Sequence, residues 1–252
     1  MGFEVAADAY DRFMGRYSRL LAPQLADLAS ILAGQHALDV GCGPGALTAE
    51  LVARLGPAAV IAVDPSESFV LAALQRNPGV TVLQASAAQL PFADGSFDAA
   101  VAQLVVHFMT DPVAGLAEMR RVTRSGGVVA ACVWDFGSDK GPLGPFWQAA
   151  RDLDPTVEAE AHLPGTREGH LTELFASAEL NDVTPAELWV SLEHASFDAW
   201  WEPFQEGVGP AGAYVASLPP GGRAALRARC HALLSEAPFT VTARAWAARG
   251  TA

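Results

Sequence analysis

Two apolar segments that each end in an acidic residue constrain the fold of this chain most. Residues 37–40 read ALDV and run directly into the glycine-rich sequence GCGPG, and residues 60–64 read VIAVD. The stretch from Ala46 to Leu55 between them spaces its apolar residues as a helix does. This order is that of a strand, a tight turn, a helix and a second strand, which together make a parallel βαβ unit. The sequence therefore predicts an α/β fold with a ligand beside the glycine-rich turn.

The glycine-rich turn is compatible with two kinds of cofactor. Gly41, Gly43 and Ala46 satisfy the loose dinucleotide pattern G-x-G-x-x-G/A. Asp64 lies near the distance expected for an acid that binds a ribose. Asp39, two residues before the first glycine, would repel a pyrophosphate but attract the ammonium and sulfonium groups of S-adenosylmethionine (SAM). Asp39 therefore favours SAM over a dinucleotide.

Three segments carry a resemblance to a known family. Residues 39–45 (DVGCGPG) fit the motif D/E-x-G-x-G-x-G at every position. Residues 90–98 (LPFADGSFD) resemble the LPF-x-DGSFD segment that precedes the fourth strand, and residues 120–129 resemble the R-V-L-K-P-G-G turn into the fifth strand. In this order and spacing, the chain resembles the class I SAM-dependent methyltransferases, in their UbiE-like (methyltransferase type 11) branch. The resemblance is strong over 37–135 and looser outside it.

The resemblance implies a Rossmann-like α/β fold, with a seven-stranded, mostly parallel sheet, an antiparallel last strand and a helical insert or cap. One methyltransferase domain would then span 1–252. It would comprise an N-terminal helical lid (1–33), a SAM-binding core (34–136) and the remaining strands (137–252). The last part would contain the insert, at about 196–237, which would sit over the cofactor as a substrate cap.

The periodicity of apolar residues predicts alternating strands and helices. The expected strands cover 37–40, 60–63, 80–83, 98–105, 128–133, 185–194 and 239–247. The expected helices cover 8–17, 20–32, 46–55, 66–76, 112–123, 146–153 and 168–178.

The resemblance also implies which residues bind SAM. Asp64 would accept hydrogen bonds from the ribose hydroxyls; the alternative is a helix N-cap, for which Ser66 is the better candidate. Asp39 would either hold amides of the turn or reach the methionine ammonium through water. Ser86 stands where the family usually has an acid that contacts the adenine amino group, so this contact is weakened. The expected cofactor-binding residues are Tyr10, Arg16, Asp39, Gly41, Cys42, Gly43, Gly45, Asp64, Pro65, Ser86, Ala87 and Gln103.

Two further residues have alternative interpretations. Arg16 lies in a segment that resembles the family's Y-D-x-F-M-G-R-x-S lid, where it would pair with the methionine carboxylate; the alternative is a solvated helix face. His107, at the end of the predicted fourth strand, is the candidate catalytic residue, because imidazole titrates near neutral pH and fits a general base. The alternative is that it packs under the cofactor. The other histidines lack metal-ligand spacing, so no metal is expected.

Composition excludes several partners. The chain has 16 basic and 28 acidic residues and a formal net charge of −12, which opposes binding to nucleic acid. No two of its three cysteines have the C-x-x-C spacing, so neither a disulfide framework nor a zinc site is expected. Residues 1–6 lack the features of a signal peptide, and no apolar stretch reaches membrane-spanning length. We expect a cytoplasmic monomer or homodimer without a membrane partner.

These observations predict a SAM-dependent methyltransferase that acts on a small molecule, with oxygen favoured over carbon and nitrogen as the methylated atom. Trp200 or Trp201 of the insert would line an apolar acceptor pocket. Two rival functions remain open. An NAD(P)-dependent oxidoreductase is disfavoured by Asp39 and by the absence of a Tyr-x-x-x-Lys pair. A non-catalytic SAM-binding protein would be favoured if the change at Ser86 had removed cofactor affinity.

Overall fold

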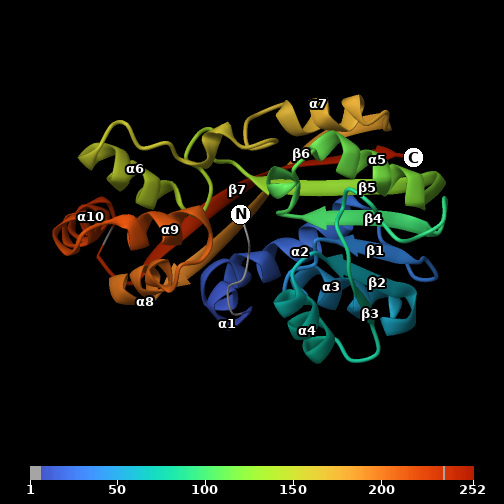
Figure 1. Cartoon of the computed structure of the whole chain (residues 1–252), viewed down its shortest axis with the longest axis horizontal. Coiled ribbons are helices and arrows are strands. Elements are labelled where there is room, and N and C mark those ends of the chain that lie inside the picture. Colours follow the sequence, from blue (N-terminus) through green and yellow to red (C-terminus); the bar gives the residue numbers. More distant parts are fainter. Residues whose placement is uncertain (1–6, 235) are drawn as a thin grey trace.

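The computed structural model describes residues 7–234 and 236–252. Their strands form one seven-stranded sheet in the order β3-β2-β1-β4-β5-β7-β6 (Figure 1). The first five strands pair in parallel, and β7 runs antiparallel to both of its neighbours, β5 and β6. The strands are β1 (Ala37–Val40), β2 (Val60–Asp64), β3 (Thr81–Gln84), β4 (Phe97–Gln103), β5 (Thr123–Trp134), β6 (Asn181–His194) and β7 (Phe239–Thr251). The predicted Rossmann-like architecture with an antiparallel last strand is confirmed.

Helices connect the strands and follow β6. The α-helices are α1 (Ala7–Tyr10), α2 (Arg16–Leu28), α3 (Ala46–Leu55), α4 (Glu67–Arg76), α5 (Pro112–Val122), α6 (Gly144–Leu153), α7 (His170–Ser177), α8 (Phe197–Trp201), α9 (Gly209–Ser217) and α10 (Pro220–Leu233). A π-helix, η1 (Asp11–Gly15), joins α1 to α2, and short 3₁₀ helices are η2 (Pro57–Ala59), η3 (Val106–Phe108), η4 (Glu160–His162) and η5 (Glu202–Glu206). Among the helices described, none is both long and apolar enough to cross a membrane.

The sheet is covered on both faces, so its central strands are buried throughout. Helices α5 and α7 lie on one side and α2, α3 and α4 on the other (Figure 1). All four residues of β1 are buried, and they alternate between two apolar clusters: Ala37 packs toward α2 and α3, and Leu38 toward α5. Two-sided burial is typical of a parallel sheet and explains the nearly continuous apolar runs of β1, β2 and β4.

The strand order reverses beside β1. From β1 the chain moves outward to β2 and β3, then returns so that β4 pairs with the other edge of β1. Asp39 is level with Ala62 of β2 and with Val101 of β4. The loops that leave the carboxyl ends of β1 and β4 therefore diverge, which opens the crevice where ligands bind in such sheets.

The N-terminal helices differ from their predicted boundaries. Instead of two separate helices over 8–17 and 20–32, α1, η1 and α2 form one helical run from Ala7 to Leu28. Gly15 does not break it, because its φ of −59° is helical. The run ends before Leu32 because Ser30 has a φ of 53°, outside the right-handed helical region. Residues 1–6 lie outside the described residues. They include the segment examined for a signal peptide and the beginning of the expected lid.

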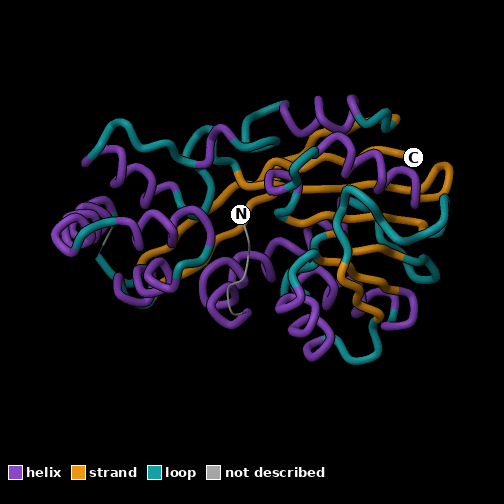
Figure 2. Tube along the Cα trace, viewed as in Figure 1, coloured by secondary structure: helices purple, strands orange, loops and turns teal. Residues whose placement is uncertain are grey.

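The helical insert follows the long strand β6, at one end of the molecule. Helices α8, α9 and α10 gather there beside the far ends of β6 and β7 (Figure 2). Phe204 anchors the insert. Its ring packs edge-on against Phe13 of η1, with the ring centroids 4.9 Å apart, and it stacks on Phe146 of α6, with the ring centroids 4.6 Å apart. Trp200 and Trp201 are each 3 % exposed and belong to this cluster. Both fill a core, although Trp200 also borders a small cleft beside η1.

Candidate active site

A cavity of about 920 Å³ opens at the carboxyl ends of β1, β2 and β4. Its walls are the turn after β1, the start of α4, residues 84–88 after β3, and residues 103–111 after β4. Tyr10, Asp11 and Ser18 of the N-terminal helical run contribute a further wall. This volume is in the upper part of the range for small-molecule sites, so the cavity has room for a cofactor and a small acceptor together.

The glycine-rich turn is bent against β2. The amides of Gly41 and Cys42 both donate to the carbonyl of Val63, at 2.8 and 2.9 Å. Gly43 has a φ of +52°, and a Cβ built on it would meet no protein atom within 4 Å. Because Gly43 also lines the cavity, this open space belongs to the ligand site. Glycine at this position lets a ligand approach the backbone closely.

Gly45 does not line the cavity, contrary to the expectation that it binds the cofactor. Its φ is +94°, and a Cβ there would collide with the side-chain amide of Asn77. Asn77 Nδ2 in turn donates to the carbonyls of Gly45, at 3.4 Å, and Ala73, at 3.1 Å. Gly45 is therefore required for the packing of α3 against α4.

Asp39 and Gln103 each present a buried oxygen without a partner in the described part of the chain. Thr48 Oγ1 donates to Asp39 Oδ2 at 2.6 Å, whereas Asp39 Oδ1 has no hydrogen bond. Gln103 Nε2 donates to the carbonyl of Ser18 at 3.0 Å, which leaves Gln103 Oε1 without a donor. Buried acceptors without donors are rare in folded proteins, and a water, an ion or a ligand can supply the missing hydrogen. An ammonium group such as that of SAM fits this requirement.

Burial raises the pKa of Asp39 from 3.8 to about 7, against the opposing effect of the Thr48 hydrogen bond. A cation in the cavity would favour the charged carboxylate and offset this cost. Asp39 does not hold the glycine-rich turn, which was one of its two expected roles. That role falls to Asp64, whose Oδ2 accepts from the amide of Gly43 at 2.9 Å.

Asp64 also begins the turn into α4. Its Oδ1 accepts from the amide of Ser66 at 2.8 Å, and Ser66 is the N-cap residue of α4. Burial raises the pKa of Asp64, although both amide hydrogen bonds oppose the shift. The carboxylate lines the cavity together with Pro65, so it joins the glycine-rich turn, the helix start and the ligand space.

Ser86, Ala87 and Ala88 form another part of the cavity wall. Ser86 Oγ accepts from the amide of Ala88 at 3.3 Å, so the hydroxyl stabilises a local turn. Met109, Thr110 and Asp111 also belong to the wall. This is the end of the cavity where the resemblance places adenine.

The charge of the cavity disfavours a pyrophosphate. No lysine or arginine belongs to its wall within residues 7–234 and 236–252. Five carboxylates do: Asp11, Asp39, Asp64, Glu67 and Asp111. A dinucleotide would bring two phosphate charges into this field, whereas SAM brings an ammonium and a sulfonium. The electrostatics disfavour the NAD(P)-dependent rival.

His107 reaches the cavity from η3, directly after β4. Its ring lies 3.9 Å from that of Phe108 and is 4 % exposed. Burial lowers the pKa of His107 from 6.5 to about 3, so the expectation that it titrates near neutral pH is wrong. At neutral pH the imidazole is uncharged, and its buried Nδ1 has no partner among the described residues.

Arg16 does not line the cavity, contrary to the expectation that it pairs with the cofactor. Its guanidinium turns away and donates to the carbonyl of Glu193 at 3.3 Å. Tyr10, by contrast, does line the cavity and packs edge-on against Phe69 at 5.6 Å. Of the described residues after 136, Leu163 alone is part of the wall. The described part of the insert therefore does not cap this cavity.

Several wall residues have no recognisable signature in the sequence. Leu104 follows β4 with a φ of 60°, which is unusual for a leucine and re-aims the chain toward the cavity. Val105 fills the space that a side chain on Gly41 would need, since a Cβ there would lie 2.5 Å from Val105 Cγ1. Neither conformation is visible in residue type or spacing.

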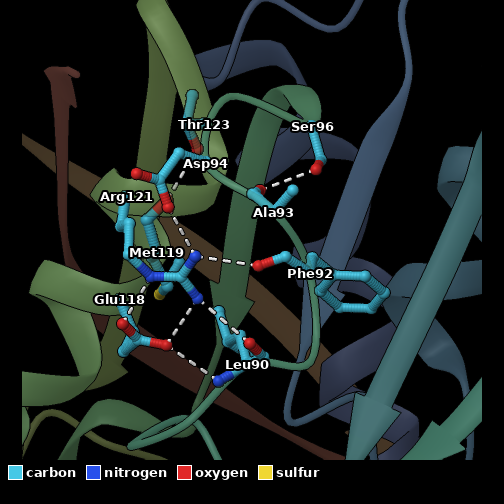
Figure 3. A network of polar contacts seen from close by, with 9 residues as sticks. All are labelled: Leu90, Phe92, Ala93, Asp94, Ser96, Glu118, Met119, Arg121 and Thr123. Carbon is cyan, nitrogen blue, oxygen red and sulfur yellow. Dashed lines mark hydrogen bonds and ion pairs between the residues drawn. The ribbon is translucent and has the colours of Figure 1, made fainter.

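A polar network holds the loop that leads into β4 (Figure 3). Arg121 donates to the carbonyls of Leu90 and Phe92, at 3.0 and 2.8 Å, and pairs with Asp94 at 2.8 Å. Glu118 Oε1 accepts a 2.7 Å hydrogen bond from Arg121 Nε, and its Oε2 accepts from the amide of Leu90 at 2.9 Å. One guanidinium thus organises most of the LPFADGSFD segment.

Comparison with known proteins agrees with this geometry. Residues 38–131 match the family model described as a methyltransferase domain. An uncharacterized methyltransferase of Mycolicibacterium vanbaalenii is 33% identical over 187 residues, which are 69% of this chain and 71% of that protein. The malonyl-[acyl-carrier protein] O-methyltransferase of Serratia marcescens is 32% identical over 170 residues, 65% of this chain and 64% of the relative.

Solved structures share the fold at low sequence identity. The YcgJ protein of Bacillus subtilis superposes with a TM-score of 0.59 and 18% identity, over 94% of this chain and 98% of that one. A SAM-dependent methyltransferase of Thermotoga maritima, described as a possible histamine N-methyltransferase, gives a TM-score of 0.52 and 20% identity, over 97% of this chain and 98% of that one. The [4+2]-cyclase SpnF gives a TM-score of 0.55 and 19% identity, over 92% of this chain and 81% of that one. Because it is 33% identical to the Mycolicibacterium protein over 71% of that protein's length, and because residues 38–131 match the methyltransferase domain model, the chain belongs to the SAM-dependent methyltransferase family.

Proposed function

We propose that this methyltransferase acts on a small molecule and methylates oxygen in preference to carbon or nitrogen. The observation that carries the proposal is that Asp39, Gln103 and His107 all line one cavity, and that each has a buried polar atom without a partner among the described residues. The two oxygens fit the cofactor, and the imidazole fits a hydroxyl of the acceptor. The Serratia relative is an O-methyltransferase by its name. This supports oxygen as the methylated atom.

Each residue has a proposed task toward the cofactor. Bound SAM supplies an electrophilic methyl group. Asp39 and Gln103 accept hydrogen bonds from its ammonium, and Asp64 accepts them from the ribose hydroxyls. Gly41, Cys42 and Gly43 provide the close backbone surface. Further contacts come from Tyr10, Pro65, Ser86 and Ala87, all of which line the cavity.

His107 has a proposed catalytic task. When a hydroxyl oxygen of the acceptor bonds to the methyl group, it still carries its proton and becomes strongly acidic. Such a proton is far more acidic than an imidazolium, so even an imidazole with a pKa of about 3 can take it. His107 would take the proton that the acceptor hydroxyl loses when it is methylated.

The remaining aspects of the function rest on composition. A net charge of −12 opposes a nucleic-acid substrate and supports a small-molecule acceptor. A cytoplasmic location and a monomeric or homodimeric state complete the proposal.

The experiment is a methyl-transfer assay preceded by a binding measurement. Calorimetric titration with S-adenosylhomocysteine, beside NADH, is expected to show binding of the first ligand only. Incubation with methyl-labelled SAM and a panel of phenols, amines and activated carbon acids then identifies the methylated atom. Label in the phenols supports the proposal, and label in the amines or carbon acids alone contradicts it. Cofactor binding without label in any acceptor would favour the non-catalytic rival.

A further inference from the structure

The cofactor cavity carries an excess of negative charge. Its wall contains five carboxylates: Asp11, Asp39, Asp64, Glu67 and Asp111. No lysine or arginine lines it among the residues that the structure describes. By sequence, residues 1–6 and residue 235 contain no lysine or arginine either. A ligand in this cavity therefore meets carboxylates without opposing basic side chains.

A nearby cation neutralises one of these five carboxylates. Arg76, which does not line the cavity, pairs with Asp11 at 2.8 Å and with Asp8 at 3.2 Å. Arg19 lies farther from Asp11, at 3.9 Å. Within the described chain, the other four wall carboxylates form no ion pair with a basic side chain. Their negative charge is therefore available to a bound cation.

The starts of helices α3, α4 and α5 reduce this negative potential but do not cancel it. All three helices begin beside the cavity, and a helix N-terminus acts as about half a positive charge. Two of them carry a wall carboxylate at that end. Glu67 lies in the first turn of α4, and Asp111 caps α5 by accepting from the amide of Ala114 at 2.9 Å. A full negative charge outweighs the partial positive charge at each of these two helix starts.

SAM and its demethylated product, S-adenosylhomocysteine, share every group that the proposed cofactor contacts bind. Both carry the ammonium assigned to Asp39 and Gln103, and both carry the ribose hydroxyls assigned to Asp64. They differ at sulfur, which is a positively charged sulfonium with a methyl group in SAM and an uncharged thioether in the product. The hydrogen bonds of the site therefore do not distinguish the two molecules, whereas the charge of the wall does.

We propose that this cavity selects the charged form of the cofactor and binds SAM more tightly than S-adenosylhomocysteine. The sulfonium gives SAM a net positive charge, whereas the ammonium and the carboxylate of the product balance each other. Asp39 and Asp64 are buried, so water screens their attraction for the sulfonium less than it would on an open surface. The weaker attraction for the product favours its exchange for fresh SAM. The inference rests on the cofactor contacts proposed above but not on the identity of the acceptor.

Calorimetric titration of the full-length protein with three ligands tests the role of charge. At low ionic strength, SAM is expected to bind about tenfold more tightly than S-adenosylhomocysteine. Sinefungin has an amine-bearing carbon in place of the methylated sulfur, so it restores the positive charge without the methyl group. Sinefungin is expected to bind within about threefold of SAM. Raising the ionic strength from about 10 mM to about 150 mM should weaken both cations more than the product.

Two results of this titration would overturn the proposal. One is an affinity for S-adenosylhomocysteine that equals or exceeds the affinity for SAM. The other is sinefungin that binds only as tightly as the product, because the methyl group and not the charge would then be recognised. If none of the three ligands binds, the cofactor site itself is refuted, and this inference with it.

Matched glutamate variants test whether the wall carboxylates are the source of the selectivity. Glu67 of α4 and Glu173 of α7 are both exposed and both lie in the first turn of their helix, but only Glu67 lines the cavity. At low ionic strength, Glu67→Gln is expected to lower the ratio of SAM affinity to product affinity by about two- to threefold. Glu173→Gln is expected to leave this ratio unchanged. Equal ratios in the two variants would overturn the role of the wall.

Discussion

Thr48 Oγ1 donates a 2.6 Å hydrogen bond to Asp39 Oδ2, and the other oxygen of this carboxylate stays buried and without a partner in the described chain. The hydrogen bond from the hydroxyl orients the carboxylate and lowers its pKa, but burial has the larger effect and raises the pKa to about 7. The protein without its cofactor therefore carries a carboxylate in an unfavourable environment. Binding a cation would relieve it, which links the stability of the fold to the cofactor.

Asp39→Asn is expected to change the pH dependence of stability. Because the pKa of Asp39 is raised on folding, folding favours its protonated form, and this contribution is lost as pH rises from about 4 to about 7. A shift of about three units corresponds to on the order of 4 kcal/mol. Asparagine does not titrate, so the variant should gain stability relative to the parent between pH 5 and pH 8. Urea unfolding at both pH values measures the difference.

The same variant should lose affinity for SAM. Replacing the carboxylate by a neutral amide removes one charge-assisted contact, so calorimetry should show binding weakened by about tenfold or more. Thr48→Val is the matched control, because it removes the hydroxyl but keeps the charge. A smaller loss in Thr48→Val than in Asp39→Asn is expected, and unchanged affinity in Asp39→Asn would refute the proposed ammonium contact.

Gly43→Val is expected to abolish cofactor binding in a folded protein. The new side chain would project into the cavity, where no protein atom lies within 4 Å of the Cβ. Gly34→Val is the matched control, since Gly34 also has positive φ and open space around its Cβ but lies outside the cavity. Both variants should lose roughly 1–2 kcal/mol of stability through backbone strain. Only Gly43→Val should lose binding of S-adenosylhomocysteine, and equal binding in the two variants would contradict the location of the site.

The part of the site built from local sequence could be predicted. The turn at 41–43, Asp39 and Asp64 follow strand ends by fixed spacings, so their meeting at one sheet edge follows from the βαβ pattern. The strands β1 and β4 were also placed within about two residues, because buried apolar runs bounded by turns are strong signals.

What could not be predicted depends on packing. The pKa of His107 falls because Phe108 and the rest of its surroundings exclude water, which no residue spacing reveals. The direction of Arg16 is set by the carbonyl of Glu193, 177 positions away in the chain. Its motif was recognisable, but the face of the helix that carries it depends on where η1 places the turn. Tertiary contacts therefore decide which motif residues reach the cavity.

His107→Leu is expected to separate catalysis from cofactor binding. If His107 accepts the proton of the acceptor, turnover should fall by about 100-fold, the lower end of the range for a lost general base. Affinity for S-adenosylhomocysteine should change by less than about threefold. Leucine also removes a buried nitrogen without a partner, so the free energy of unfolding should rise by about 1–3 kcal/mol. A parallel loss of turnover and of cofactor affinity would show that the ring only packs.

Arg121→Lys is expected to destabilise the fold more than its conservative nature suggests. An ammonium group cannot reproduce the planar set of contacts with the carbonyls of Leu90 and Phe92 and with Glu118 (Figure 3). We expect a loss of about 1–3 kcal/mol in urea unfolding. Arg120→Lys is the matched control. Arg120 precedes Arg121 in α5, pairs with the exposed carboxylate of Glu179 and donates to the carbonyl of Ala178 at 3.2 Å, contacts that an ammonium can also make, so the variant should change stability by less than about 0.5 kcal/mol. Equal unfolding midpoints for the two variants would show that the network does not stabilise the loop before β4.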